Sequence, residues 1–241
     1  MKRNSLNFKA YLQNFYHLTR YNFKVIFAHR FIYFLVFSFI VFILITLLRV
    51  VNSDSMPKAD TIYNLLFLPG ILLIFYPCVY GVQLDVDAGM LETLFGIPNY
   101  RYKVWLVRLT YTFLFVALLL FVLAVLSDLI IAPIPIGRMV FHLMFPLLFL
   151  GCTSFLFATV THSGHGAGAI MLIIGFGLWF AWDFLAGSRW NLYHNPFSVS
   201  SDTSAILIDD TTFYNRVILL VGAIIALLWG LLNLQKREKF I

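Results

Sequence analysis

Charged residues are scarce in this chain. Asp, Glu, Lys and Arg together make up 12% of the 241 residues, whereas hydrophobic residues make up 61%, and the mean hydropathy is +0.88. A soluble domain of this size cannot bury so much apolar surface. The shortage of charge therefore excludes a soluble globular protein and predicts an integral membrane protein.

Several motifs that carry catalysis are missing. The sequence contains no Gly-x-x-x-x-Gly-Lys-Ser/Thr phosphate loop, so the chain cannot itself hydrolyse ATP by that route. It contains neither His-Glu-x-x-His nor Gly-x-Ser-x-Gly, which argues against an intramembrane protease or lipase. The two cysteines, Cys78 and Cys152, lie inside apolar runs, where neither a disulfide nor a cysteine-rich metal site is expected. We therefore expect no catalytic residue, metal or cofactor in this chain.

Long apolar runs are what the sequence has instead. A helix needs about 18 or more mostly apolar residues to cross a hydrocarbon core of roughly 30 Å. Backbone groups in lipid must find their hydrogen bonds within the protein, so these runs are expected to be helical. The prediction is an all-α fold, a polytopic bundle of six transmembrane helices in one domain. The six predicted spans are residues 31–48, 61–84, 109–127, 139–161, 166–186 and 217–234.

The distribution of Lys and Arg predicts the orientation. An even number of spans places both termini on one side, and that side carries 12 of the 17 basic residues. By the positive-inside rule both termini are cytoplasmic, in a multi-pass protein of the cell (inner) membrane. The net charge of +6 follows from this bias, so no nucleic-acid partner is inferred. The twelve are Lys2, Arg3, Lys9, Arg20, Lys24, Arg30, Arg101, Lys103, Arg108, Lys236, Arg237 and Lys239.

Residues 6–29, before the first span, form a basic amphipathic stretch. At helical spacing, Phe8 and Leu12 fall on one face, and Lys9 and Arg20 fall on the other. A helix of this kind lies along the inner leaflet in contact with membrane lipid. We therefore predict an interfacial elbow helix here.

The longest charged interlude between spans is the segment 83–108. A helix over 84–95 would place apolar and acidic residues on different faces. The sequence Gly96-Ile97-Pro98 signals its end, and a new helix is expected near Tyr100. From amphipathicity alone, this helix either docks into a partner or simply lies on lipid headgroups.

The residues of this segment resemble a known motif. Asp87-Ala-Gly89-Met-Leu91-Glu92-Thr-Leu94, then Pro98, Arg101 and Arg108, resembles the cytoplasmic loop between the second and third spans of type-2 ABC exporter permeases. That family has an acidic residue before Gly-Thr-Leu-Glu-x-Leu, then a Pro, an Arg and a Lys. Here Met90 replaces the Thr and Arg108 the Lys.

The resemblance implies a coupling helix within a loop at 84–104 that docks onto a separate cytosolic ABC ATPase subunit, where ATP and Mg would bind. It also implies a homodimer, or a heterodimer with a similar permease, around a central substrate path. The docking residues it implies are Asp87, Gly89, Leu91, Glu92, Leu94, Pro98, Arg101 and Arg108.

The resemblance further implies that the second and fifth spans line the substrate path. Proline kinks a helix and glycine permits close approach, and both are also common in spans for packing alone. Asp183, near the outer end of the fifth span, is explained equally well by interfacial solvation and by a gate. The candidates for path or helix packing are Pro69, Gly70 and Pro77 in the second span and Gly175, Gly177 and Asp183 in the fifth. The longest outer loop is expected at 186–212.

Two other functions stay open at this point. A multi-pass membrane enzyme or cofactor-handling protein would use His142, His162, His165 or the aspartates near the outer boundary, Asp128 and Asp183. His162 and His165 stand three apart without Cys, Asp or Glu nearby, which falls short of a zinc ligand set. A non-transporting membrane anchor for an ATPase is the other alternative. No residue pattern indicates a particular substrate.

Overall fold

The computed structural model describes residues 31–52, 57–87, 101–185, 187–198 and 205–234. Within these ranges the regular structure is entirely helical, and no strand occurs. Residues 6–29 and 88–100, which hold the predicted elbow helix and most of the predicted coupling helix, lie outside them. The helices are α2 (Phe31–Asn52), α3 (Ala59–Asp87), the π-helix η1 (Arg101–Leu106), α5 (Val107–Ile130), α6 (Ile136–Thr161), α7 (Gly164–Phe180), α8 (Trp182–Leu185) and α9 (Ala205–Asn233).

The prediction of an all-helical fold with several helices of membrane-spanning length and composition is confirmed. Among the described residues, five helical segments are long and apolar enough to cross a membrane, namely those in α2, α3, α5, α6 and α9. The predicted fifth span, 166–186, is divided: α7 has 17 residues and is followed by the short α8. At 1.5 Å per residue α7 extends about 26 Å, slightly less than a hydrocarbon core.

Two predicted boundaries are wrong. α3 continues past 84 to Asp87, so the residues expected to open the coupling helix instead extend the second span. The reason is that Asp85 is buried against a partner from α5, which makes a carboxylate tolerable inside the bundle. At the other boundary, α9 begins at Ala205, so the outer loop expected at 186–212 is helical in its last residues.

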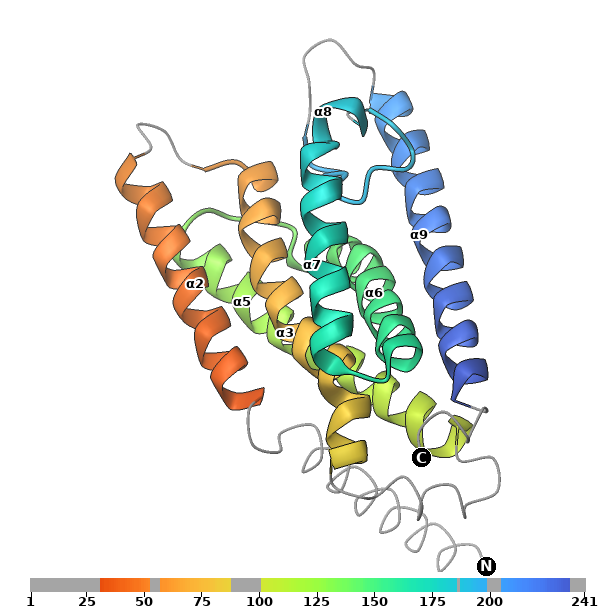
Figure 1. The fold of residues 1–241 in the computed structure, drawn as a ribbon. Coiled ribbons are helices and arrows are strands. Elements are labelled where there is room, and N and C mark those ends of the chain that lie inside the picture. Colours follow the sequence, from red (N-terminus) through yellow and green to blue (C-terminus); the bar gives the residue numbers. More distant parts are fainter. Residues whose placement is uncertain (1–30, 53–56, 88–100, 186, 199–204, 235–241) are drawn as a thin grey trace, which may run out of the picture.

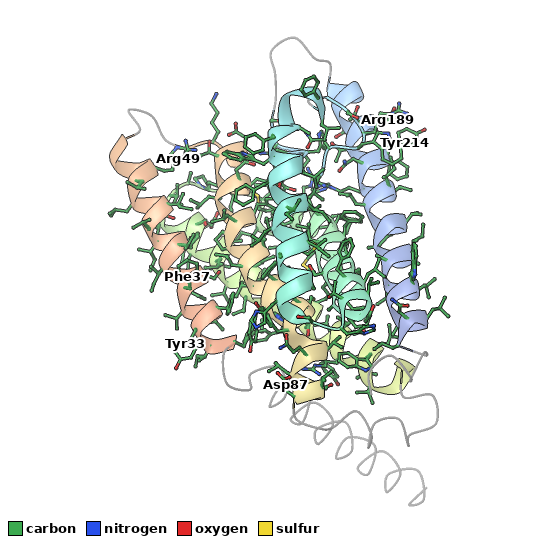
Figure 2. All side chains as sticks on the ribbon, viewed as in Figure 1. Tyr33, Phe37, Arg49, Asp87, Arg189 and Tyr214 are labelled. Atoms are coloured by element: carbon green, nitrogen blue, oxygen red, sulfur yellow. The ribbon has the colours of Figure 1, made fainter. Side chains whose placement is uncertain are left out.

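α6 lies at the centre of the bundle and packs against α3, α5, α7 and α9 (Figure 1). α2 packs on α3 at one edge, and α9 occupies the opposite edge. Tyr33 and Phe37 point outward from α2 (Figure 2), with 71% and 52% of their surface exposed. Apolar side chains exposed in this way suit a lipid environment. We call the end with residues 187–198 the loop end, and the end where α3 finishes the Asp87 end.

Small groups let α3 approach its neighbours. A Cβ added to Gly70 of α3 would lie 2.8 Å from a methyl carbon of Leu147 on α6. At the preceding residue of α3, the carbonyl of Pro69 accepts a buried hydrogen bond of 3.1 Å from the Ser38 hydroxyl of α2. Pro69 and Gly70, two of the residues predicted for the substrate path or for helix packing, therefore lie in buried contacts between helices.

Candidate functional site

A cavity of about 640 Å³ lies between α3 and α7. Its walls are almost wholly apolar, with Ile71 and Phe75 on α3 and Phe176 and Trp179 on α7. Phe176 and Trp179 are 57% and 60% exposed, so the cavity is continuous with the outer surface of the bundle. A large apolar cavity with few polar groups is a typical binding site for an apolar or amphipathic molecule.

Of the residues predicted for the substrate path whose side chains are described, only one is among those that line this cavity. Gly175 lines it, and Asn64, Ser154 and Tyr193 supply polar groups to its wall. Gly177 is exposed, and a Cβ added there would meet nothing within 4 Å. Pro69, Gly70 and Pro77 are absent from its lining, and Asp183 lies in α8, where its side chain is not described.

Sequence reasoning missed the bulky residues that form the wall. On α7, Leu172, Phe176 and Trp179 follow the i, i+4, i+7 spacing of one helix face, and all three are exposed. Leu68 and Phe75 are seven apart on α3 and share a face in the same way. This spacing was readable in the sequence, but it does not differ from that of a lipid-facing stripe.

The loop at 187–198 covers the loop end of the cavity. The Tyr193 hydroxyl donates a 3.2 Å hydrogen bond to the carbonyl of Gly175, and its ring packs edge-on against Phe67 with the ring centres 5.6 Å apart. The Asn195 side chain donates to the carbonyl of Asp60 at 2.8 Å. These contacts hold the loop against α7 and α3, so the loop forms a fixed cover over this end of the cavity.

A buried cation anchors the same loop to α9. Arg216 is 5% exposed, and its guanidinium donates to the Tyr63 hydroxyl and to the carbonyl of His194, each at 3.1 Å. It also donates to the Asn215 side-chain oxygen at 3.1 Å. Among the residues described, no carboxylate forms an ion pair with it.

His194 makes this anchor sensitive to pH. Burial, with Arg216 and then His142 nearby, lowers the pKa of His194 from 6.5 to about 4. The folded state therefore favours the neutral ring, whose Nε2 lies 2.8 Å from the Thr212 hydroxyl. Since the pKa is higher in the unfolded chain, the stability that His194 contributes is complete above about pH 6.5 and is lost as the pH falls towards 4.

We expect amide hydrogen exchange in residues 187–198 to speed up between pH 7 and pH 4.5, after correction for intrinsic exchange. In His194→Asn this pH dependence should be clearly smaller, because the replacement cannot take up a proton. Carboxylates titrate in both proteins, so the difference between them isolates His194. An equal change in both proteins would contradict the assignment.

A buried ion pair joins α3 and α5 at the Asp87 end. The Arg108 Nη1 lies 3.1 and 3.0 Å from the two carboxylate oxygens of Asp85, and both side chains are less than a tenth exposed. The guanidinium carbon also lies 5.3 Å from the ring centre of Trp105. Because Asp85 precedes residues 88–100 and Arg108 follows them, the pair braces the base of the predicted coupling segment.

The predicted docking residues are placed only in part. Asp87 is exposed at the end of α3 (Figure 2), and Arg101 begins η1 close to the expected helix start at Tyr100. Arg108 is 7% exposed and forms an ion pair with Asp85, so its side chain joins two helices within the bundle. The other five residues, Gly89, Leu91, Glu92, Leu94 and Pro98, lie outside the described residues.

The histidines of the alternative enzyme function do not converge. His142 lies near the start of α6 and His162 caps its end, which separates them by about 30 Å along the helix. His165 contacts Tyr80 on α3. Asp128 has a local role, since its carboxylate accepts a hydrogen bond of 2.8 Å from the Ile134 amide in the turn between α5 and α6. No group of three metal-ligating side chains occurs among the described residues.

Comparison of the chain with protein-family models, with curated proteins and with solved structures finds no match.

Proposed function

We propose that this protein is the transmembrane subunit of an ATP-driven exporter of the type-2 ABC class. Two copies, or one copy and a similar permease, form the substrate path, and a separate cytosolic ATPase supplies the energy. The proposal rests first on the cavity between α3 and α7, which are the second and fifth spans that the family resemblance assigns to the path.

The chemistry of the cavity suits a lipid-like or otherwise apolar cargo. Asn64, Ser154 and Tyr193 are its polar groups, whereas its other walls are apolar and aromatic side chains or backbone. An apolar molecule could enter from the bilayer because Leu172 and Phe176 are exposed beside the opening. In a dimer the cavities of the two subunits would face a common path.

The brace between Asp85 and Arg108 supports coupling. Coupling between distant sites is carried by rigid helices, packed side chains and networks of hydrogen bonds and ion pairs. The ion pair links the end of α3 to the start of α5, directly at the two ends of the segment that carries the motif. Movement of a docked ATPase would therefore pass to α3, which forms one wall of the cavity.

Charge reversal at Glu92 tests the docking. We expect Glu92→Arg to lower the amount of ATPase that co-purifies with the tagged protein from native membranes at least about tenfold, since a favourable contact becomes a repulsive one. A phosphate-loop ATPase identified by mass spectrometry in the wild-type preparation is the reference for this measurement.

Asp210→Arg is the matched control for this experiment. It changes the net charge by the same amount, and Asp210 is exposed near the start of α9, where its carboxylate lies 3.8 Å from the exposed Arg189. Its ATPase yield should equal that of the wild type. Unchanged association in Glu92→Arg, with a normal melting temperature, would refute the docking role, and absence of any ATPase from the wild-type preparation would refute the proposed function.

A further inference from the structure

A second cavity, of about 350 Å³, lies between α6 and α9 at the loop end. It shares no described lining residue with the cavity between α3 and α7. Its polar lining comes from His142 on α6 and from Asp209, Thr212 and Arg216 on α9. Nothing in the proposed function uses this cavity.

Two buried nitrogens in the lining have no hydrogen-bond partner among the described residues. They are Nε of Arg216 and Nδ1 of His142. A buried cation whose charge no carboxylate balances is costly, and an unsatisfied buried donor adds to that cost. An anion in the cavity would offset both costs, because it balances the charge of Arg216 and accepts hydrogen bonds from Nε and, in the tautomer of His142 that carries the proton there, from Nδ1.

The charges of the cavity favour a zwitterionic ligand over a simple anion. Asp209 lines the cavity and is exposed, so it places a carboxylate at the rim. This carboxylate repels a second negative charge and attracts an ammonium group. The cavity thus offers a buried positive group and an exposed negative group on the same side of α9.

The position and the apolar wall favour a lipid. The part of α9 that is long and apolar enough to cross a membrane begins at Asp209, and Arg216 lies about 10 Å further along the helix, in the first third of that part. Phe213, Val217 and Leu220 follow the same face and are 64%, 41% and 40% exposed. An acyl chain that continued from the cavity would lie along these side chains.

We propose that this cavity binds one zwitterionic phospholipid with an amine headgroup. Arg216 and His142 hold its phosphate, the ammonium group lies against Asp209, and one acyl chain packs on Phe213, Val217 and Leu220. The bound lipid would fill the gap between α6 and α9 beside the loop that covers the other cavity. This inference is independent of the proposed transport function.

Native mass spectrometry of the purified full-length protein tests the inference. The probes are phosphatidylethanolamine, phosphatidylglycerol and diacylglycerol with identical acyl chains, and inorganic phosphate as competitor. We expect one phosphatidylethanolamine to bind, with phosphatidylglycerol weaker, diacylglycerol weaker still, and no displacement by inorganic phosphate. Equal binding of diacylglycerol or phosphatidylglycerol would overturn the proposal, as would displacement by inorganic phosphate.

Matched variants locate the site. His142→Leu should lower phosphatidylethanolamine affinity about tenfold, the size expected for one lost hydrogen bond to a charged group, and His165→Leu at the Asp87 end should not. Asp209→Asn should abolish the preference over phosphatidylglycerol, whereas Asp210→Asn should keep it. Arg216→Gln also removes the hydrogen bonds to Tyr63 and His194, so its effect on lipid binding cannot be separated from its effect on the loop. Unchanged binding in both His142→Leu and Asp209→Asn would overturn the site.

Discussion

Asp85→Ala is expected to lower the free energy of unfolding by about 3–5 kcal/mol, the range for breaking a buried ion pair by removing one partner. The replacement leaves the Arg108 guanidinium in the bundle without the carboxylate that lies 3.0 Å away. Thermal unfolding in detergent should show a clearly lower melting temperature.

Asp87→Ala is the control, because Asp87 stands on the same helix only two residues away but is exposed. Its melting temperature should stay close to that of the wild type. The double variant Asp85→Leu/Arg108→Met replaces the pair by apolar groups and should recover most of the stability. Similar melting of Asp85→Ala and Asp87→Ala would contradict the brace.

If the brace also couples the motor to the bundle, the double variant separates stability from coupling. It should melt near the wild-type temperature but lose part of the ATPase-driven transport, because apolar contact is non-directional and lacks the hydrogen bonds that Arg108 Nη1 donates to the two Asp85 oxygens. Full transport by a stable double variant would limit the pair to a structural role.

Gly151→Leu is expected to have the second largest effect, a destabilisation of about 3 kcal/mol from overpacking. A Cβ added to Gly151 of α6 would lie 2.8 Å from the Phe113 ring on α5 and 2.9 Å from the Ile74 side chain on α3. Three helices meet at this point, so relief of the clash requires at least one of them to move. The melting temperature in detergent is again the measurement.

Gly177→Leu is the matched control. Gly177 also lies within a membrane helix, but a Cβ there would meet nothing within 4 Å. The same substitution should leave stability unchanged or raise it slightly, because glycine is the weaker helix former. Equal destabilisation by both variants would show that the packing at Gly151 is not the cause.

The sequence was sufficient to predict the class of fold. Runs of apolar residues long enough to cross a bilayer exclude most alternatives, since lipid leaves few ways to satisfy the backbone. The starts of α2 and α3 and the end of α6 fall within two residues of the predicted positions. Prediction was weaker where polar residues near a span find partners, as for Asp85 in α3, and where a span is short, as in α7.

The candidate site was predicted only in outline. The resemblance pointed to the second and fifth spans as the walls of a substrate path, which stays a prediction, and a cavity lies between α3 and α7. Within these spans the residue chemistry singled out glycines and prolines, whereas bulky side chains such as Phe75 and Trp179 form much of the wall. Which face of an apolar helix lines a cavity depends on the neighbouring helices. When a helix is apolar on all sides, its sequence does not indicate which face contacts which neighbour.

The segment 83–108 shows most clearly what each level decided. The sequence by itself determined that a charged, motif-bearing connection joins two membrane helices, because charge is expensive within a span and hydropathy therefore marks its limits. Only the tertiary structure decided that Asp85 and Arg108 belong to the bundle and not to the connection. The physical reason is that each charge is tolerable when buried only beside the other, and residues 23 apart in the sequence meet only after the helices have packed.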